Sequence, residues 1–199
     1  DPIRMEKAYN QERSEWQSLF SKEDKGMEED KPCWIAPDLS EGQWWDMCLP
    51  DYWEKNGLKN FDGVVWFRRS FEIPAEWIGK PLKLNLGMID DEDITYFNGV
   101  EIARGAGYMT PRTYTIPAKL VKAGKAVLAV RVSDFGGEGG IHGKAEDLYV
   151  EADGKRISLA GDWKYRIGLS LTGFPPAPIS PVQSSSYPTV LFNAMVKPW

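Results

Sequence analysis

The strongest constraint on the fold is an alternation in which apolar residues occupy every second position, beginning at Val64. Segments 64–73 and 82–86 follow it, which is typical of antiparallel strands that bury one face. The pair Asn98-Gly99 then stands between two further apolar segments. It is the strongest short signal for a β-hairpin, because both residues of such a turn adopt positive φ. We therefore expect mainly antiparallel β-structure.

More segments of this kind follow at intervals of about 8 to 15 residues, a spacing typical of all-β sandwiches. They are 93–97, 100–102, 112–116, 127–132, 148–150, 157–159 and 163–167. No long helical pattern separates them, which argues against a parallel α/β sheet. The sequence thus predicts an all-β fold, an antiparallel jelly-roll β-sandwich.

The N-terminal part has a different character. Residues 1–25 predict a helix, with Asp1 as its cap, Pro2 at its first position and apolar residues at helical spacing. Residues 32–63 are rich in Pro and Gly and predict a long irregular arm. The arm carries many aromatic residues, which must either cover a face of the sandwich or line a groove: Trp34, Trp44, Trp45, Tyr52 and Trp53.

These patterns divide the chain into three parts. Residues 1–54 form the helix and the aromatic-rich arm, and residues 55–172 form the sandwich. In the remaining part, 173–199, a stretch rich in Pro and Ser predicts an extended linker. An apolar segment at 187–196 follows the linker, and we expect it to return toward a catalytic domain outside this sequence.

Charge and cysteine content exclude several kinds of partner. The net charge is -5 and the pI is near 5.1, which argues against nucleic acid or anionic lipid because phosphate binding needs a basic patch. No stretch approaches the roughly 20 apolar residues of a membrane span. Cys33 and Cys48 lack zinc-ligand spacing, and the sequence leaves open whether they form a bridge or stay as free thiols.

A catalytic serine would need a base beside it, and His142 is the one histidine of the chain. It lies in the glycine-rich segment 136–143, without an Asp three residues before it. The chain also lacks a Gly-x-Ser-x-Gly nucleophile motif. We therefore predict no catalytic residue here, and we interpret His142 as a surface loop residue that forms hydrogen bonds.

Charged residues near the predicted strands allow two readings. The acidic run 90–93 is either a solvated strand end or a structural Ca²⁺ site, and we predict no metal-ligating residue and no cofactor. Arg68 and Arg69 lie within a strand, so at least one points inward or is covered by the arm. We expect it to pair with a buried acid such as Asp90 or Asp134.

Nine tryptophans are a high number for this length. A flat ring can stack on the apolar face of a sugar, but such residues also build large aromatic cores. If the chain binds carbohydrate, the candidate contact residues are Trp44, Trp45, Trp53, Tyr108 and His142.

Several of these segments carry a family resemblance. Segments 66–74 and 96–99 resemble the sugar-binding β-sandwich of β-galactosidase and β-glucuronidase relatives. Four segments, 61–69, 139–143, 161–165 and 188–195, more closely resemble the domain inserted into sialate O-acetylesterases of the SGNH-hydrolase class. The resemblance implies a galactose-binding-like jelly roll.

It also implies a role in carbohydrate metabolism. The chain would be a non-catalytic accessory domain beside the catalytic SGNH domain of the same parent chain. That parent, a serine hydrolase, would remove O-acetyl groups from sialic acid or related sugars, and such enzymes are usually periplasmic or secreted. Three alternatives stay open: an independent carbohydrate-binding module, the sugar-binding domain of a glycoside hydrolase, or a scaffold with all tryptophans buried.

Overall fold

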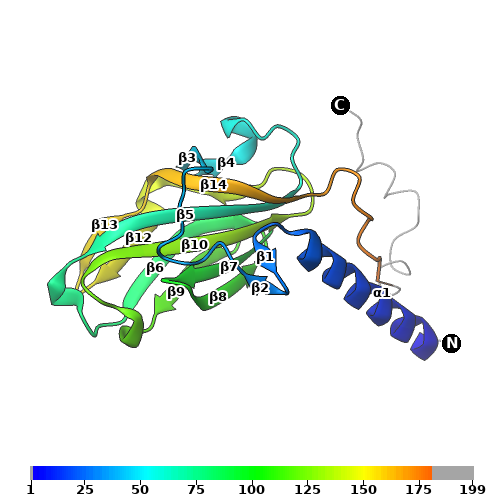
Figure 1. Ribbon diagram of the computed structural model, residues 1–199, viewed down its shortest axis with the longest axis horizontal. Coiled ribbons are helices and arrows are strands. Elements are labelled where there is room, and N and C mark those ends of the chain that lie inside the picture. Colours follow the sequence, from blue (N-terminus) through cyan, green and yellow to red (C-terminus); the bar gives the residue numbers. More distant parts are fainter. Residues whose placement is uncertain (1, 181–199) are drawn as a thin grey trace.

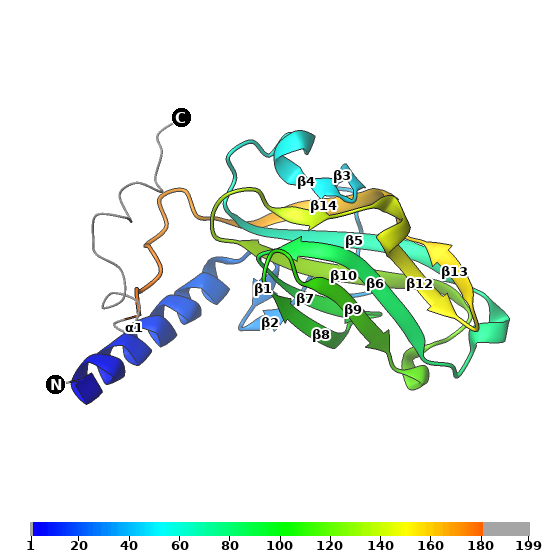
Figure 2. The same ribbon diagram turned by 180° about the vertical axis from the view of Figure 1, so that it is seen from behind.

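The chain forms a helix followed by two antiparallel β-sheets packed face to face (Figures 1 and 2). The structure is a computed structural model that describes residues 2–180, so the predicted return segment 187–196 lies outside the described residues. Helix α1 (Pro2–Glu23) agrees with the predicted N-terminal helix. The predicted all-β sandwich is confirmed.

The first sheet has six strands in the order β3-β14-β5-β10-β7-β8. Its strands are β3 (Trp45–Leu49), β5 (Gly63–Ile73), β7 (Glu92–Phe97), β8 (Val100–Ala106), β10 (Gly124–Asp134) and β14 (Gly161–Ser170). The second sheet runs β13-β12-β6-β11-β4, with β9 also paired to β6. Its strands are β4 (Asp51–Tyr52), β6 (Leu82–Asp90), β9 (Pro111–Ile116), β11 (Gly140–His142), β12 (Leu148–Ala152) and β13 (Lys155–Ser158).

Short elements complete the described chain. They are the strand pair β1 (Met27–Glu28) and β2 (Lys31–Pro32) and the 3-10 turns η1 (Trp53–Asn56), η2 (Ala75–Trp77), η3 (Ala118–Leu120) and η4 (Ala145–Asp147). The predicted turn between β7 and β8 is confirmed, with φ of 47° at Asn98 and 80° at Gly99. No helix among residues 2–180 is long and apolar enough to cross a membrane.

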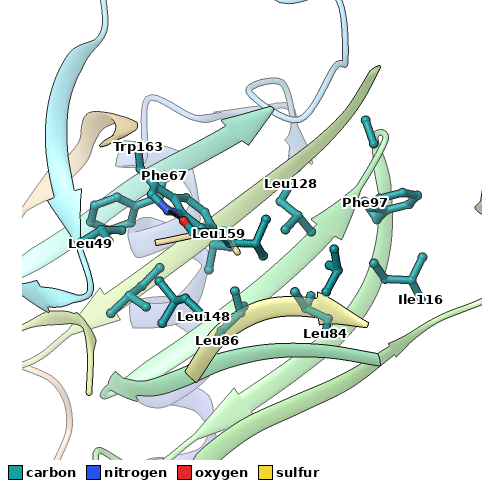
Figure 3. Close-up of a cluster of buried hydrophobic side chains, with 14 of the residues drawn as sticks. Leu49, Phe67, Leu84, Leu86, Phe97, Ile116, Leu128, Leu148, Leu159 and Trp163 are labelled. Carbon is teal, nitrogen blue, oxygen red and sulfur yellow. Dashed lines mark hydrogen bonds between the residues drawn. The ribbon is translucent and has the colours of Figure 1, made fainter. Parts of the chain in front are cut away.

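The main core lies between the two sheets. Alternate residues of β5, such as Val65 and Phe67, point into it and are fully buried. Leu84 and Leu86 of β6 reach it from the second sheet, and Trp163 of β14 closes it with its indole N–H on Leu159 O at 2.7 Å (Figure 3). This packing follows directly from the period-two pattern of the sequence.

The outer face of the first sheet is covered by the arm, and a second cluster of buried residues lies there. Val64, Trp66 and Arg68 of β5 point to this side, and all three are buried. Trp34 and Trp44 of the arm pack over them, with their ring centroids 5.3 Å apart. The arm therefore covers a sheet face, which is one of the two roles predicted for its aromatic residues.

Arg68 holds this arm in place. Its guanidinium donates to Glu41 Oε1 at 2.8 Å and to the carbonyl oxygens of Trp34 and Ala36 at 2.7 and 2.9 Å. The expected pairing of this arginine with Asp90 or Asp134 is wrong. Arg68 points to the outer face of the first sheet, where its guanidinium bonds to the arm instead of to either acid. Its predicted covering by the arm is confirmed.

Two further expectations need correction. The stretch 32–63 is not irregular throughout, since it supplies β3 to the first sheet and β4 to the second. The glycine-rich segment 136–143 is not entirely loop, since it contains β11, which pairs with β4 and β6. Strands β3, β4 and β11 are short and are held by partners distant in sequence. Cys33 and Cys48 are free thiols.

Candidate functional site

Three aspartates meet where β6 and β10 end. Asp90 is the last residue of β6, Asp91 follows it, and Asp134 is the last residue of β10. One carboxylate oxygen of each lies within 4.8 Å of the others. We call these three residues the aspartate cluster. Since a carboxylate is a hard oxygen ligand, the cluster has the chemistry to hold a hard cation.

Sheet pairing and main-chain hydrogen bonds fix the cluster. Asp134 pairs with Gly63 of β5, which is close-packed against the chain at Leu169. The Asp91 N–H donates to Ser133 O at 2.9 Å, which ties the two corners of the cluster together. The Asp91 carbonyl accepts from Gly107 N at 2.8 Å and from the Arg112 guanidinium at 3.0 Å. The three aspartates are therefore held by a rigid main chain.

The Asp134 side chain is fully buried, but only one of its two carboxylate oxygens has a hydrogen-bond partner within residues 2–180. Its Oδ1 accepts from Gly136 N at 3.1 Å. Its Oδ2 is buried and has no hydrogen-bond partner within residues 2–180. A buried polar atom without a partner is costly, so it calls for an explanation.

The surroundings of the cluster are acidic. Burial is the main cause that raises the pKa of Asp134 to about 7, and the carboxylates of Asp62, Asp91 and Asp90 add to it. The pKa of Asp90 is also raised to about 7, first by burial and then by a hydrogen bond that its protonated form donates to Asp91 and by nearby carboxylates. Burial likewise raises the pKa of Glu54 on η1. The fold thus concentrates negative charge here.

These findings correct the prediction of a solvated strand end at 90–93. Asp90 and Asp91 are partly buried, and Asp93 is buried and points between the sheets. Asp93 accepts from Arg112 Nε at 2.6 Å and from Thr95 and Tyr114 hydroxyls. Asp93 therefore differs from the aspartate cluster in having an arginine partner.

His142 lies beside this region rather than on a surface loop. It belongs to β11 and is 7% exposed. Its ring stacks on Tyr52 at a centroid distance of 4.6 Å, and its Nε2 lies 3.0 Å from Tyr108 O. Burial lowers the pKa of His142, so the neutral ring is favoured at neutral pH. The hydrogen bond to Tyr108 O and the carboxylate of Glu138 oppose this effect of burial on the pKa. His142 is thus a packed, hydrogen-bonded residue.

The structure sorts the five candidate carbohydrate-contacting residues. Trp44 is 6% exposed and Trp53 is 0% exposed, so the expectation that they are open stacking surfaces is wrong. Trp45 and Tyr108 are each 57% exposed. Tyr108 and His142 are brought together by their hydrogen bond, while Trp45 lies on edge strand β3 against Tyr165. A role for Trp45, Tyr108 and His142 in sugar binding stays a prediction.

Sequence reasoning noticed Asp90 and Asp134 separately but did not join them. It also missed Glu54, whose Oε1 is buried without a hydrogen-bond partner among the described residues. The signal for the cluster was that an Asp follows a few residues after each of two predicted strands, 82–86 and 127–132. Only the register between β10, β5 and β7 shows that these ends meet.

Fold and site together define an antiparallel β-sandwich domain with an acidic cluster at the ends of β6 and β10. No protein-family model matches the sequence. No curated protein matches it either.

Among solved structures, a glycosyl hydrolase family 2 member from Bacteroides cellulosilyticus is similar, at 23% identity and a TM-score of 0.48. The match covers 54% of this chain and 17% of that one. A Bacteroides uniformis β-glucuronidase 2 matches at 20% identity and a TM-score of 0.49, over 66% of this chain and 15% of that one. A β-glucuronidase from an uncultured Clostridium matches at 22% identity and a TM-score of 0.42. That match covers 62% of this chain and 23% of the other one. This chain thus spans less than a quarter of each, and likenesses this distant carry no inference about activity or ligand.

Proposed function

We propose that this chain is a non-catalytic, galactose-binding-like accessory domain of a carbohydrate-active enzyme. Its parent would be a serine hydrolase of the SGNH class that removes O-acetyl groups from sialic acid or related sugars. The proposal rests on the sequence resemblance of segments such as 139–143 and 161–165 to sialate O-acetylesterases. The sandwich fold supports it, because the resemblance implies a jelly roll.

The observation that carries the non-catalytic part is the environment of His142. The Nε2 of this sole histidine contacts a backbone carbonyl at 3.0 Å rather than a serine hydroxyl, and one ring face is covered by Tyr52. A serine hydrolase needs its imidazole within hydrogen-bond reach of the nucleophile. In this proposal the catalytic serine, histidine and aspartate therefore belong to the parent's SGNH domain, which would be the partner of this chain. The parent would be periplasmic or secreted.

The first experiment measures hydrolysis of O-acetylated sialic acid and of a generic acetyl ester. The isolated chain, its His142→Ala variant and the full-length gene product are compared at equal concentration. We expect turnover by the full-length protein and a rate at the buffer background for both forms of the chain. Turnover by the isolated chain that is lost in His142→Ala would overturn the non-catalytic assignment. A full-length protein that cleaves a glycosidic bond instead of the ester would place the chain in a glycoside hydrolase.

An independent carbohydrate-binding module is the second candidate, because Trp45 and Tyr108 are each 57% exposed. Exposed aromatic rings are suitable surfaces for sugar stacking. Calorimetric titration of the isolated chain with sialic acid, galactose and glucuronic acid tests this function. The module predicts saturable binding that Trp45→Ala or Tyr108→Ala weakens, whereas an accessory domain predicts no heat of binding without its partner domain.

A further inference from the structure

The fully buried acids of the described chain differ in whether an arginine is paired with them. Asp24 accepts from Arg131 Nε at 2.7 Å and from the indole N–H of Trp66 at 3.0 Å. Asp93 is paired with Arg112, whose Nε lies at 2.6 Å. Asp134 is equally buried, but no Lys or Arg forms an ion pair with it within residues 2–180. Its charge lacks the compensation that the other two receive, and burying an unpaired charge is expensive.

The guanidinium of Arg112, which donates to the main-chain oxygen of Asp91, forms no hydrogen bond to the carboxylates of the cluster. All the donors of Arg112 that form bonds are directed to Asp93 and to main-chain carbonyls, including Ile89 O and Asp91 O at 3.0 Å each. Arg112 therefore holds the main chain next to the aspartates without neutralising their side chains. Within residues 2–180, no Lys or Arg forms an ion pair with Asp90, Asp91 or Asp134.

We propose that Asp90, Asp91 and Asp134 bind a divalent cation, Ca²⁺, in a site at the ends of β6 and β10. Two independent observations carry the proposal. The carboxylate oxygens converge within 4.8 Å, and the fully buried Asp134 contributes an Oδ2 that has no hydrogen-bond partner in the described chain. A cation bound to Oδ2 satisfies that atom and balances the cluster. The inference is independent of the proposed function.

The donor set selects the class of metal. The cluster offers carboxylate oxygens and neither a thiolate nor an imidazole, which favours hard cations over Zn²⁺ or Cu²⁺. Two of the six oxygens already accept from the main chain: Asp134 Oδ1 from Gly136 and Asp91 Oδ2 from Phe135. The remaining carboxylate oxygens and water suit the irregular shell of 6–8 oxygens that Ca²⁺ accepts. Mg²⁺ requires a near-ideal octahedron and releases water reluctantly, so it should bind more weakly.

Further acids surround the three ligands and favour a cation electrostatically. Glu54 on η1 and Glu138 after β10 act on Asp90, and Asp62 acts on Asp134. Glu54 is held by the Gly139 N–H at its Oε2, while its buried Oε1 has no partner in the described chain. Calcium affinity increases with the number of charged ligands. Glu54 is therefore placed to strengthen binding through its charge.

The test is calorimetric titration of the chelator-treated chain with CaCl₂ and, separately, with MgCl₂. Thermal unfolding is followed in Ca²⁺ and in EDTA. We expect one saturable Ca²⁺ site per chain, weaker Mg²⁺ binding and a higher Tm in Ca²⁺. Asp134→Asn and Asp90→Asn should each lower Ca²⁺ affinity by about tenfold or more, since loss of even an outer ligand contact has effects of that size. Asp153→Asn, in the exposed turn between β12 and β13, is the matched control and should bind as the wild type does.

A second readout separates metal binding from a purely structural role. In EDTA, Asp134→Asn should unfold at the same temperature as the wild type or higher, because it removes an uncompensated buried charge. In Ca²⁺, Asp134→Asn should instead unfold at a lower temperature than the wild type. The proposal is overturned if Ca²⁺ neither binds nor raises the Tm of the wild type. It is equally overturned if Asp90→Asn and Asp134→Asn retain wild-type Ca²⁺ affinity.

Discussion

Arg112 Nε and Asp93 Oδ1 form an ion pair of 2.6 Å inside the sandwich, where the two side chains are 1% and 0% exposed. The pair joins β9 of the second sheet to β7 of the first. It also anchors the main chain that leads into the aspartate cluster, through Ile89 O and Asp91 O. One arginine therefore connects the stability of the sandwich to the geometry of the candidate cation site.

Substitution Arg112→Met should strongly destabilise the chain. It leaves Asp93 buried without a counter-charge, and breaking a buried pair from one side costs about 3–5 kcal/mol. Urea unfolding measures the free energy of unfolding. The control is Arg104→Met, since Arg104 pairs with Glu101 at the surface and such pairs contribute about 0–1 kcal/mol. Equal losses in the two variants would contradict this account of Arg112.

Substitution Arg68→Met should loosen the arm while leaving the sandwich folded. The variant keeps the apolar volume of the side chain but loses the hydrogen bonds to Glu41, Trp34 O and Ala36 O. Hydrogen bonds to a charged group are worth about 1.5–3 kcal/mol. Hydrogen exchange should become faster at Leu39 and Trp44, whose amides bond within the arm.

Lys80→Met serves as the control for that experiment, because Lys80 makes an exposed ion pair with Asp153 and both residues lie outside the arm. In this control variant, the amide hydrogens of the arm should exchange at the wild-type rate. Unchanged exchange of the arm in Arg68→Met would show that the aromatic packing alone holds it.

Substitution Gly139→Ala should destabilise the glycine-rich segment. A Cβ at this position would lie 2.1 Å from the Trp53 indole, so the buried ring or the strand would have to move. Overpacking of this kind costs about 1–3 kcal/mol. Thermal unfolding is the measurement, and Gly42→Ala is the matched control because its Cβ would meet only Ser40 Oγ at 3.8 Å. A Tm for Gly139→Ala equal to that of the control would contradict the close packing of Trp53.

Substitution Trp66→Phe should weaken the junction between the helix and the first sheet. It removes the indole N–H that donates to Asp24 Oδ1 at 3.0 Å and leaves space beside a buried carboxylate. We expect a loss of about 1–3 kcal/mol in the free energy of unfolding, measured in urea. Trp45→Phe, at an exposed ring, should change it by less than about 0.5 kcal/mol. The interpretation fails if the exposed substitution costs as much as the buried one.

Local pattern was sufficient to predict most strands of the sandwich. The alternation in 64–73 and 82–86 survives in β5 and β6, and Asn98-Gly99 forms the hairpin turn. These features depend on neighbours in sequence, since the period of side chains along a strand and the φ of a turn are local properties. Strand β11 carries no such pattern, because its place is decided by pairing with Met88–Asp90 and Asp51–Tyr52.

The candidate site was less accessible to sequence reasoning, because it depends on register. Asp90 and Asp134 are separated by β7, β8 and β9 along the chain, yet their carboxylates converge. The partner of Arg68 was also decided by the arm, which folds over the outer face of the sheet. Aromatic content predicted either a core or a sugar-stacking surface, and burial assigns Trp44 and Trp53 to cores and leaves Trp45 open.

The arm has a consequence for how the chain matures during translation. The arm leaves the ribosome before strands β5 and β14, because residues 32–62 precede them in the sequence. Its Trp34 ring contacts Arg166 of β14, whose Cζ lies 4.7 Å from the ring centroid. Domains generally fold as units during synthesis. Here Trp34 cannot complete its contacts until Arg166 of β14 has emerged. The arm is therefore among the last segments to dock, and nascent chains that end before β14 should depend on chaperones.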